Sequence, residues 1–130
     1  MRLNHVANRL HGDQFEVVVT MLTSCLGFEV LRRTDRSIWL RQPGVNVDLQ
    51  FSRSATASRD ADKRRSQVSF LSDTPKLALE QLAAWLAAHG VAAAVGAYSD
   101  REFYLDAPTA FVDFVIEAML PELADYGPGR

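Results

Sequence analysis

Two aspartates interrupt apolar, alternating stretches of this 130-residue sequence. Asp48 lies within residues 45–51 and Asp113 lies within residues 110–116. Successive side chains of a strand point to opposite faces, so each aspartate lies opposite a face made of valine, leucine, isoleucine or phenylalanine. A carboxylate inside such a strand is costly unless water, a cationic partner or a bound cation compensates its charge. The two aspartates are therefore the first candidates for chemistry in this chain.

The positions of these aspartates indicate an internal repeat. They are 65 residues apart, and three other landmarks recur in the same order at spacings of 62 to 64. The paired landmarks are His5 with Gln67 in a short first strand, Gly27 with Gly90 after a helix, and the helical stripe Phe15, Val18, Val19, Leu22 with Leu79, Leu82, Ala83, Leu86. Four matches in one order favour a duplicated unit over coincidence.

Each unit has the pattern βαβββ, which predicts an α+β fold of two modules related by a pseudo-twofold axis. The expected strands of the first unit are residues 3–8, 28–33, 37–41 and 45–51, with a helix over 12–26. Those of the second are 67–71, 91–98, 102–105 and 110–116, with a helix over 75–89. We expect one domain over residues 1–130, divided into module one (1–52), an exposed linker (53–64), module two (65–117) and a tail (118–130).

Composition limits the class of protein. The chain is 48% hydrophobic, which is enough for a core, and its net charge of −2 gives no electrostatic case for nucleic acid. No apolar run is long enough to cross a bilayer, and the N-terminal residues lack a signal-peptide core. Cys25 is the only cysteine, so no internal disulfide can form, and we expect it to be a small buried hydrophobe. These features favour a cytoplasmic protein.

Three motifs resemble the vicinal oxygen chelate superfamily, which includes glyoxalase I, extradiol dioxygenases and bleomycin-resistance proteins. They are Leu3-Asn4-His5-Val6, Leu26-Gly27-Phe28-Glu29-Val30, and Asp106-Ala107-Pro108-Thr109-Ala110-Phe111-Val112-Asp113-Phe114. The last resembles the family ending Asp-Pro-x-Gly-Asn-x-x-Glu-Leu. The resemblance covers residues 1 to about 118. It implies a curved mixed sheet around a central cavity.

The resemblance also implies a metal site built from the first and fourth strand of each module. The matching positions are His5, Asp48, Gln67 and Asp113, all expected on the strand face away from the helices and pointing into one cavity. Such ligands suit Zn, Ni, Mn, Co or Fe(II). Both fourth-strand positions carry Asp where metal-binding members usually have Glu, which is longer by about 1.5 Å. Two interpretations of the aspartates are open: they bind a metal, or they are the remnant of a metal site that no longer binds one.

Two functions follow from the resemblance. The first is a metal-dependent lyase, isomerase or dioxygenase, in which Asp48 or Asp113 acts as the catalytic proton-transfer base. The second is a metal-free protein that binds or sequesters a small molecule. In either case Trp39, Arg41, Glu102 and Tyr104 are candidate substrate contacts, the alternative being ordinary sheet surface or a dimer contact. We expect a homodimer with a small-molecule ligand, and no nucleic-acid or membrane partner.

Overall fold

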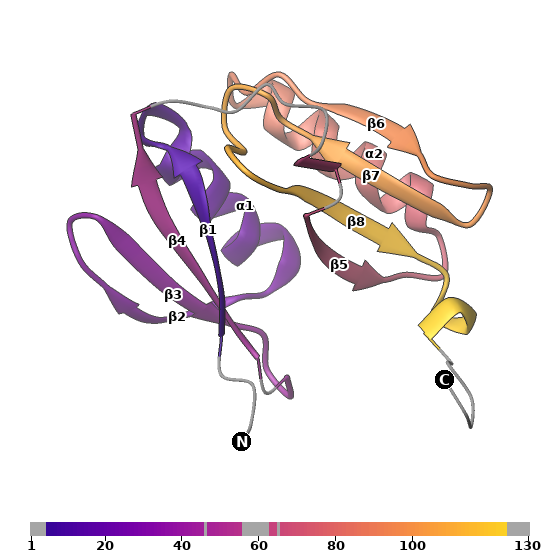
Figure 1. Ribbon diagram of the computed structural model, residues 1–130, viewed down its shortest axis with the longest axis horizontal. Coiled ribbons are helices and arrows are strands. Elements are labelled where there is room, and N and C mark those ends of the chain that lie inside the picture. Colours follow the sequence, from indigo (N-terminus) through magenta and orange to yellow (C-terminus); the bar gives the residue numbers. More distant parts are fainter. Residues whose placement is uncertain (1–4, 46, 56–62, 65, 125–130) are drawn as a thin grey trace.

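The computed structural model describes residues 5–45, 47–55, 63–64 and 66–124. They form two modules that lie side by side, one from each half of the chain (Figure 1). Each module has one four-stranded sheet, with the strand orders β1-β4-β3-β2 and β5-β8-β7-β6. In both sheets the first strand runs parallel to the fourth and the other neighbours are antiparallel. The predicted α+β fold of two βαβββ modules is confirmed.

The elements of module one are β1 (His5–His11), η1 (Gly12–Gln14), α1 (Phe15–Leu26), β2 (Glu29–Arg33), β3 (Ser37–Arg41) and β4 (Asp48–Ser54). Those of module two are β5 (Gln67–Leu71), α2 (Pro75–Ala88), β6 (Ala94–Ala97), β7 (Glu102–Asp106), β8 (Val115–Met119) and a final turn, η3 (Pro121–Ala124). None of the described helices is both long and apolar enough to span a membrane.

Sequence features set the ends of both helices. Gly27 and Gly90 have φ angles of 70° and 83°, the left-handed conformation that glycine adopts without steric cost after a helix. Pro75 opens α2, where its missing N–H is not needed. Most of the predicted apolar stripe is buried in both helices, although Ala83 is only half-buried. These side chains join one core with the helix-facing residues of both sheets.

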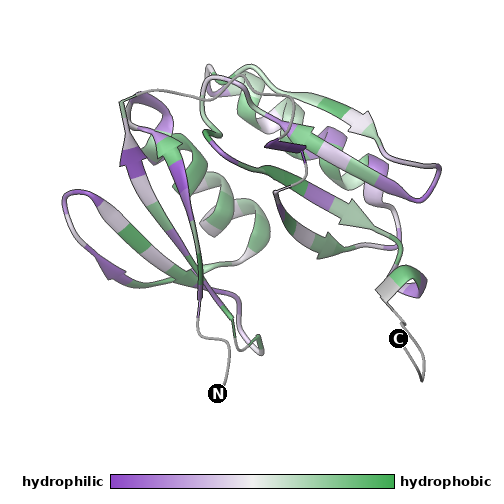
Figure 2. Cartoon of the chain, in the orientation of Figure 1, coloured by the Kyte–Doolittle hydropathy of each residue, from purple (hydrophilic) through white to green (hydrophobic). Residues whose placement is uncertain are grey.

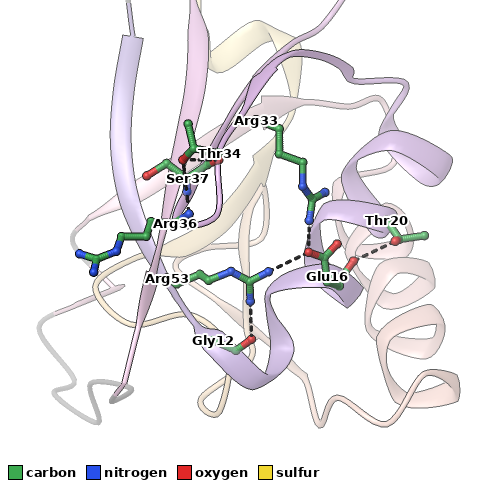
Figure 3. A network of polar contacts seen from close by, with 8 residues as sticks. All are labelled: Gly12, Glu16, Thr20, Arg33, Thr34, Arg36, Ser37 and Arg53. Carbon is green, nitrogen blue, oxygen red and sulfur yellow. Dashed lines mark hydrogen bonds and ion pairs between the residues drawn. The ribbon is translucent and has the colours of Figure 1, made fainter.

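An arginine network ties the start of α1 to its sheet (Figure 3). Glu16 accepts hydrogen bonds from Arg33 of β2 and from Arg53 of β4, the latter at 2.8 Å. Arg53 also donates to the Gly12 carbonyl at 3.0 Å and lies 4.2 Å from the centre of the Phe15 ring. The helix therefore enters at a fixed position relative to the two strands.

The hydropathy of the residues follows the arrangement of helices and strands. In Figure 2, hydrophobic residues extend along α1 and over both ends of β8, with one hydrophilic band between them, whereas hydrophilic residues gather at the turn between β6 and β7. α1 and α2 contact each other, so the two modules share part of their core.

The last strand is shifted from its predicted position. It was expected over residues 110–116, but β8 begins at Val115. Residues 110–112 pair instead with the end of β1: His11 N–H donates to the Ala110 carbonyl at 2.8 Å, and Val112 N–H donates to the Arg9 carbonyl at 3.2 Å. Phe111 is fully buried there and stacks on Phe114. Residues 110–112 thus join the two modules. Pairing with β1 buries their apolar side chains, just as a place in the second sheet would have done.

Two smaller expectations were wrong. Lys63, assigned to an exposed linker, is 7% exposed, because its ammonium group lies 2.8 Å from Asp106 and donates to the Phe111 carbonyl at 2.9 Å. Cys25, expected to be buried, is exposed on α1, since it lies outside the apolar stripe. Arg53 and Ser54, also assigned to that linker, belong to β4, and residues 56–62 lie outside the described part of the chain.

Candidate functional site

The face of the first sheet away from α1 carries an imidazole, a carboxylate and a guanidinium. His5 is the register partner of Asp48 across β1 and β4. Asp48 is 6% exposed, and both its carboxylate oxygens accept from Arg41 of β3, Nε to Oδ1 at 2.6 Å and Nη2 to Oδ2 at 3.1 Å. This hydrogen bonding, followed by the charge of Asp48, raises the pKa of Arg41. The charge of Asp48 is therefore compensated by a two-point ion pair with arginine.

The second sheet carries its buried carboxylate at a different register position. Gln67 of β5 is opposite Val115, whereas Asp48 is opposite the equivalent residue, His5, in the first sheet. The buried acid is Glu117, which is 7% exposed and accepts from the Ser69 hydroxyl at 2.7 Å. Sequence reasoning missed Glu117 as a candidate, although strand alternation puts it on the same face as Asp113.

Aromatic rings lie beside Glu117 on this face. Tyr104 is its partner across β7 and β8, and Gly96 is the next partner, on β6. Gly96 leaves room for the Tyr104 ring, which comes to 2.2 Å from the place a Cβ would occupy. Tyr98 lies 5.0 Å from Tyr104 between ring centres. Burial is the main cause that raises the pKa of Tyr98; a hydrogen bond with Gln67 opposes it, and the Glu117 charge adds to it.

Asp113 lies where the modules meet. It accepts hydrogen bonds from the backbone N–H and the Nε of Arg9, both at 3.1 Å, and from the Asn8 amide at 3.5 Å. His5 is four residues from Arg9 along β1, which is roughly 13 Å in a strand. Asp113 therefore contacts the end of β1 opposite to the one that carries His5 and its partner Asp48.

The four predicted metal ligands are not brought together within one chain. Gln67 lines a cavity between the modules, but that cavity does not include His5, Asp48 or Asp113. Among the residues that the structure describes, no three His, Cys, Asp or Glu side chains are grouped so that they could hold a metal ion. As arranged in a single chain these residues do not fit a metal, and the ligand set stays a prediction.

Two of the four predicted substrate contacts, Trp39 and Tyr104, occupy equivalent positions in the two sheets. Trp39 faces Gln50 across β3 and β4, as Tyr104 faces Glu117 across β7 and β8. Each ring has an arginine over its face: Arg32 lies 5.1 Å from the centre of Trp39, and Arg64 lies 4.9 Å from the centre of Tyr104.

Glu102 and Arg41 lie at the ends of their strands. Glu102 is half-buried at the start of β7, and Arg41 ends β3. The substrate-binding roles of all four residues stay a prediction.

Comparison with known proteins gives the fold class. No protein-family model matches the chain, and neither does any curated protein. Solved structures do match over nearly their full length. One described as a possible glyoxalase from Bacillus cereus has 16% identity and a TM-score of 0.60, with 92% of this chain and 98% of that chain covered. Lactoylglutathione lyase from Agrobacterium tumefaciens has 12% identity and a TM-score of 0.55, with coverage of 94% and 95%.

A third match is TnmS3, an antibiotic-binding protein from Streptomyces sp. CB03234. It has 14% identity and a TM-score of 0.54, with 93% of this chain and 96% of that chain covered. The chain therefore has the fold of glyoxalase-like proteins, the fold of the vicinal oxygen chelate superfamily, as the sequence motifs predicted. At these identities the similarity establishes the fold and leaves the activity to be argued from the site.

Proposed function

We propose that this chain is a cytoplasmic, metal-independent small-molecule-binding protein that uses the faces of its two sheets away from the helices. The observation that carries this proposal is the pairing of Asp48 with Arg41. A carboxylate whose two oxygens both accept from one guanidinium is already compensated, so a metal ion would have to displace the arginine. The fold similarity to an antibiotic-binding protein agrees with a binding role.

The ligand class follows from the rings and charges on these faces. Trp39 and Tyr104 offer one aromatic surface in each sheet. Arg32 lies over the Trp39 ring and Arg64 over the Tyr104 ring, so each ring can contact a flat cationic group. Arg41 keeps guanidinium N–H groups beyond the two that bind Asp48, and its side chain is 46% exposed. We therefore expect an aromatic ligand with polar substituents, contacted by Trp39, Arg41, Glu102 and Tyr104.

The two tryptophans of the chain, Trp39 and Trp85, make binding measurable. Titration with aromatic antibiotics, bleomycin among them, should quench tryptophan fluorescence for those that bind. Trp39→Phe should abolish the quenching, whereas Trp85→Phe, on α2 beside His89, should keep it. Quenching that persists in Trp39→Phe and disappears in Trp85→Phe would place the ligand elsewhere and contradict the proposal.

A second candidate is a metal-dependent lyase, isomerase or dioxygenase, and one observation favours it. His5 and Asp48 are direct register partners, so an imidazole and a carboxylate lie at adjacent positions on the first sheet. Gln67 and Asp113 would then complete the set only if a second copy of the chain or a rearrangement brought them near. In this reading Asp48 or Asp113 is the catalytic base.

Metal analysis separates the two functions. Protein purified without chelator should contain no stoichiometric transition metal, and added Ni, Zn, Mn, Co or Fe(II) should not raise its thermal midpoint. Near-stoichiometric metal that disappears in His5→Ala but persists in His89→Ala would support the enzyme instead, because His89 lies at the end of α2.

We also propose a homodimer. All five residues of β2 are exposed, and two of them, Val30 and Leu31, are apolar at 49% and 46% exposure. The other three residues of this edge strand are charged, but exposed apolar side chains on an edge strand form a surface that a partner can cover. Light scattering at micromolar concentration should give twice the mass of the chain, and a monomeric mass would contradict the proposal.

A further inference from the structure

A cavity of about 690 Å³ lies between the two modules, lined by residues from both faces of the edge strand β5. Its walls include Val6 and Leu49 from the first sheet, Val68 and Phe70 from β5, and Leu79 and Leu82 from α2. β1 and β5 are edge strands of their sheets, so the cavity forms where the two modules meet without a shared sheet. Its volume is in the range of small-molecule sites in proteins.

Among the residues that the structure describes, none that lines this cavity has a charged side chain or is a histidine. The four polar ones among them already have hydrogen bonds: Gln42 donates to the Leu26 carbonyl at 2.9 Å, Gln67 donates to the Arg64 carbonyl at 3.1 Å, Ser69 donates to Glu117, and Ser72 accepts from Thr74 N–H at 3.1 Å. A charged ligand would lose hydration here without gaining a counter-charge. The walls therefore favour a neutral, apolar molecule.

Depth distinguishes a small molecule from a protein partner. The floor residues Leu79, Leu82 and Ala118 are 1%, 8% and 2% exposed, whereas Val45 and Leu71 at the rim are 43% and 53% exposed. A folded second copy would touch the rim but could not reach such a floor, whereas a small apolar molecule could contact both. The apolar rim also gives that molecule a path from water to the floor.

We propose that this inter-module cavity is a binding site for one neutral, lipophilic small molecule per chain. The proposal does not depend on the proposed function, because none of its expected ligand contacts, Trp39, Arg41, Glu102 and Tyr104, lines this cavity. Binding draws on apolar surface from both modules, so an occupied cavity also holds the modules together.

The test uses N-phenyl-1-naphthylamine, a neutral apolar dye whose fluorescence rises in apolar surroundings. The full chain should bind it saturably with one molecule per chain. Ala78→Trp puts an indole into the cavity wall on α2 and should weaken dye binding by at least about tenfold. The matched control is Ala84→Trp, which makes the same change at an exposed position of the same helix outside the cavity and should leave binding unchanged.

A second pair of variants guards against a misfolded Ala78→Trp. Val45→Lys puts a charge at the rim and should weaken dye binding, whereas Leu77→Lys, at an equally apolar exposed position outside the cavity, should not. Circular dichroism confirms the fold of each variant.

Two results would overturn the proposal. One is the absence of saturable dye binding by the parent chain; if that parent is also a dimer that dissociates in Ala78→Trp, the cavity belongs to a second copy of the chain. The other is dye binding that is unchanged in both Ala78→Trp and Val45→Lys.

Discussion

Both aspartates that the sequence singled out are paired with arginine. Asp48 is held at two points by Arg41, and Asp113 accepts from the backbone and side chain of Arg9. A carboxylate in an apolar strand needs compensation, and arginine provides it with directed hydrogen bonds. The Asp113 pair is more exposed, at 56% and 36% for its two side chains, so water and salt weaken it. The two aspartates therefore differ in the burial of their ion pairs, although they occupy matching positions in the sequence repeat.

The hydroxyl of Ser69 should stabilise the fold through Glu117. Ser69→Ala removes the hydrogen bond to a carboxylate that is 7% exposed, so the free energy of unfolding should fall by about 1–3 kcal/mol. Urea denaturation measures this change. Ser24→Ala, at an exposed position of α1, is the control and should change stability by less than about 0.5 kcal/mol. Equal effects of the two substitutions would show that Glu117 gains nothing from Ser69.

Tyr98 should make stability depend on pH in the alkaline range. Burial raises the pKa of its phenol above the ordinary value of about 10, so the folded state holds this proton more tightly than the unfolded state does. Its contribution is complete below pH 10 and is lost as the pH rises from there through the folded-state pKa. The free energy of unfolding, measured from pH 8 to 11, should fall less steeply in Tyr98→Phe than in the parent. Identical slopes would contradict the raised pKa.

At the scale of elements, helices and their ends followed local rules, whereas several strands did not: β4 covers residues 48–54 and not 45–51, and β8 is shifted further. Residues 110–116 alternate as a strand should, yet β8 begins at Val115 because Ala110, Phe111 and Val112 pair with β1 or pack beside it. Alternation reports that a segment will be extended and half-buried, and it does not say which neighbour it joins. The candidate carboxylate of the second module changed from Asp113 to Glu117 for this reason.

The glycine after α1 should matter because of its backbone conformation. Gly27→Ala forces a Cβ onto a residue with φ of 70°, where nothing else crowds it, and should lower the free energy of unfolding by about 1 kcal/mol. Gly12→Ala is the matched control, since Gly12 does not have a positive φ and its added Cβ would lie at an ordinary 3.6 Å from the Ser54 carbonyl. Thermal melts of the two variants should differ, and equal midpoints would rule out the conformational explanation.

At the scale of the whole molecule, the modules are joined through buried polar contacts as well as through α1 and α2. Lys63 reaches the turn after β7, where its ammonium group lies 2.8 Å from Asp106 Oδ1 and donates to the Phe111 carbonyl. Phe111 in turn bridges to Leu10 of the first module. Lys63 therefore anchors the linker on the second module, at the segment that pairs with β1 of the first.

Removing Lys63 should destabilise the whole chain. Lys63→Met leaves the carboxylate of Asp106, 17% exposed, without its cation, and the free energy of unfolding should fall by about 3 kcal/mol. The double variant Lys63→Met/Asp106→Leu removes both charges and should recover much of that loss. Guanidinium denaturation measures both, and a double variant no more stable than the single one would show that the charge pairing is unimportant.

The sequence by itself determined the modules, their order and most of their elements. The repeat of Gly27 and Gly90, the helical stripes and the strand alternation depend on local geometry, so β3 and β5 begin and end where expected. The same alternation predicted that His5, Asp48 and Gln67 lie on strand faces away from the helices, and it indicated that each aspartate needs a partner.

Only the tertiary structure decided which partner each carboxylate has. Arg41 is seven residues from Asp48 and reaches it across a hairpin, whereas Arg9 is 104 residues from Asp113 and meets it only because the modules pack through β1. Lys63 and the inter-module cavity have no sequence pattern of their own for the same reason. Packing between distant segments sets their burial and partners, and a periodicity confined to one segment cannot report it.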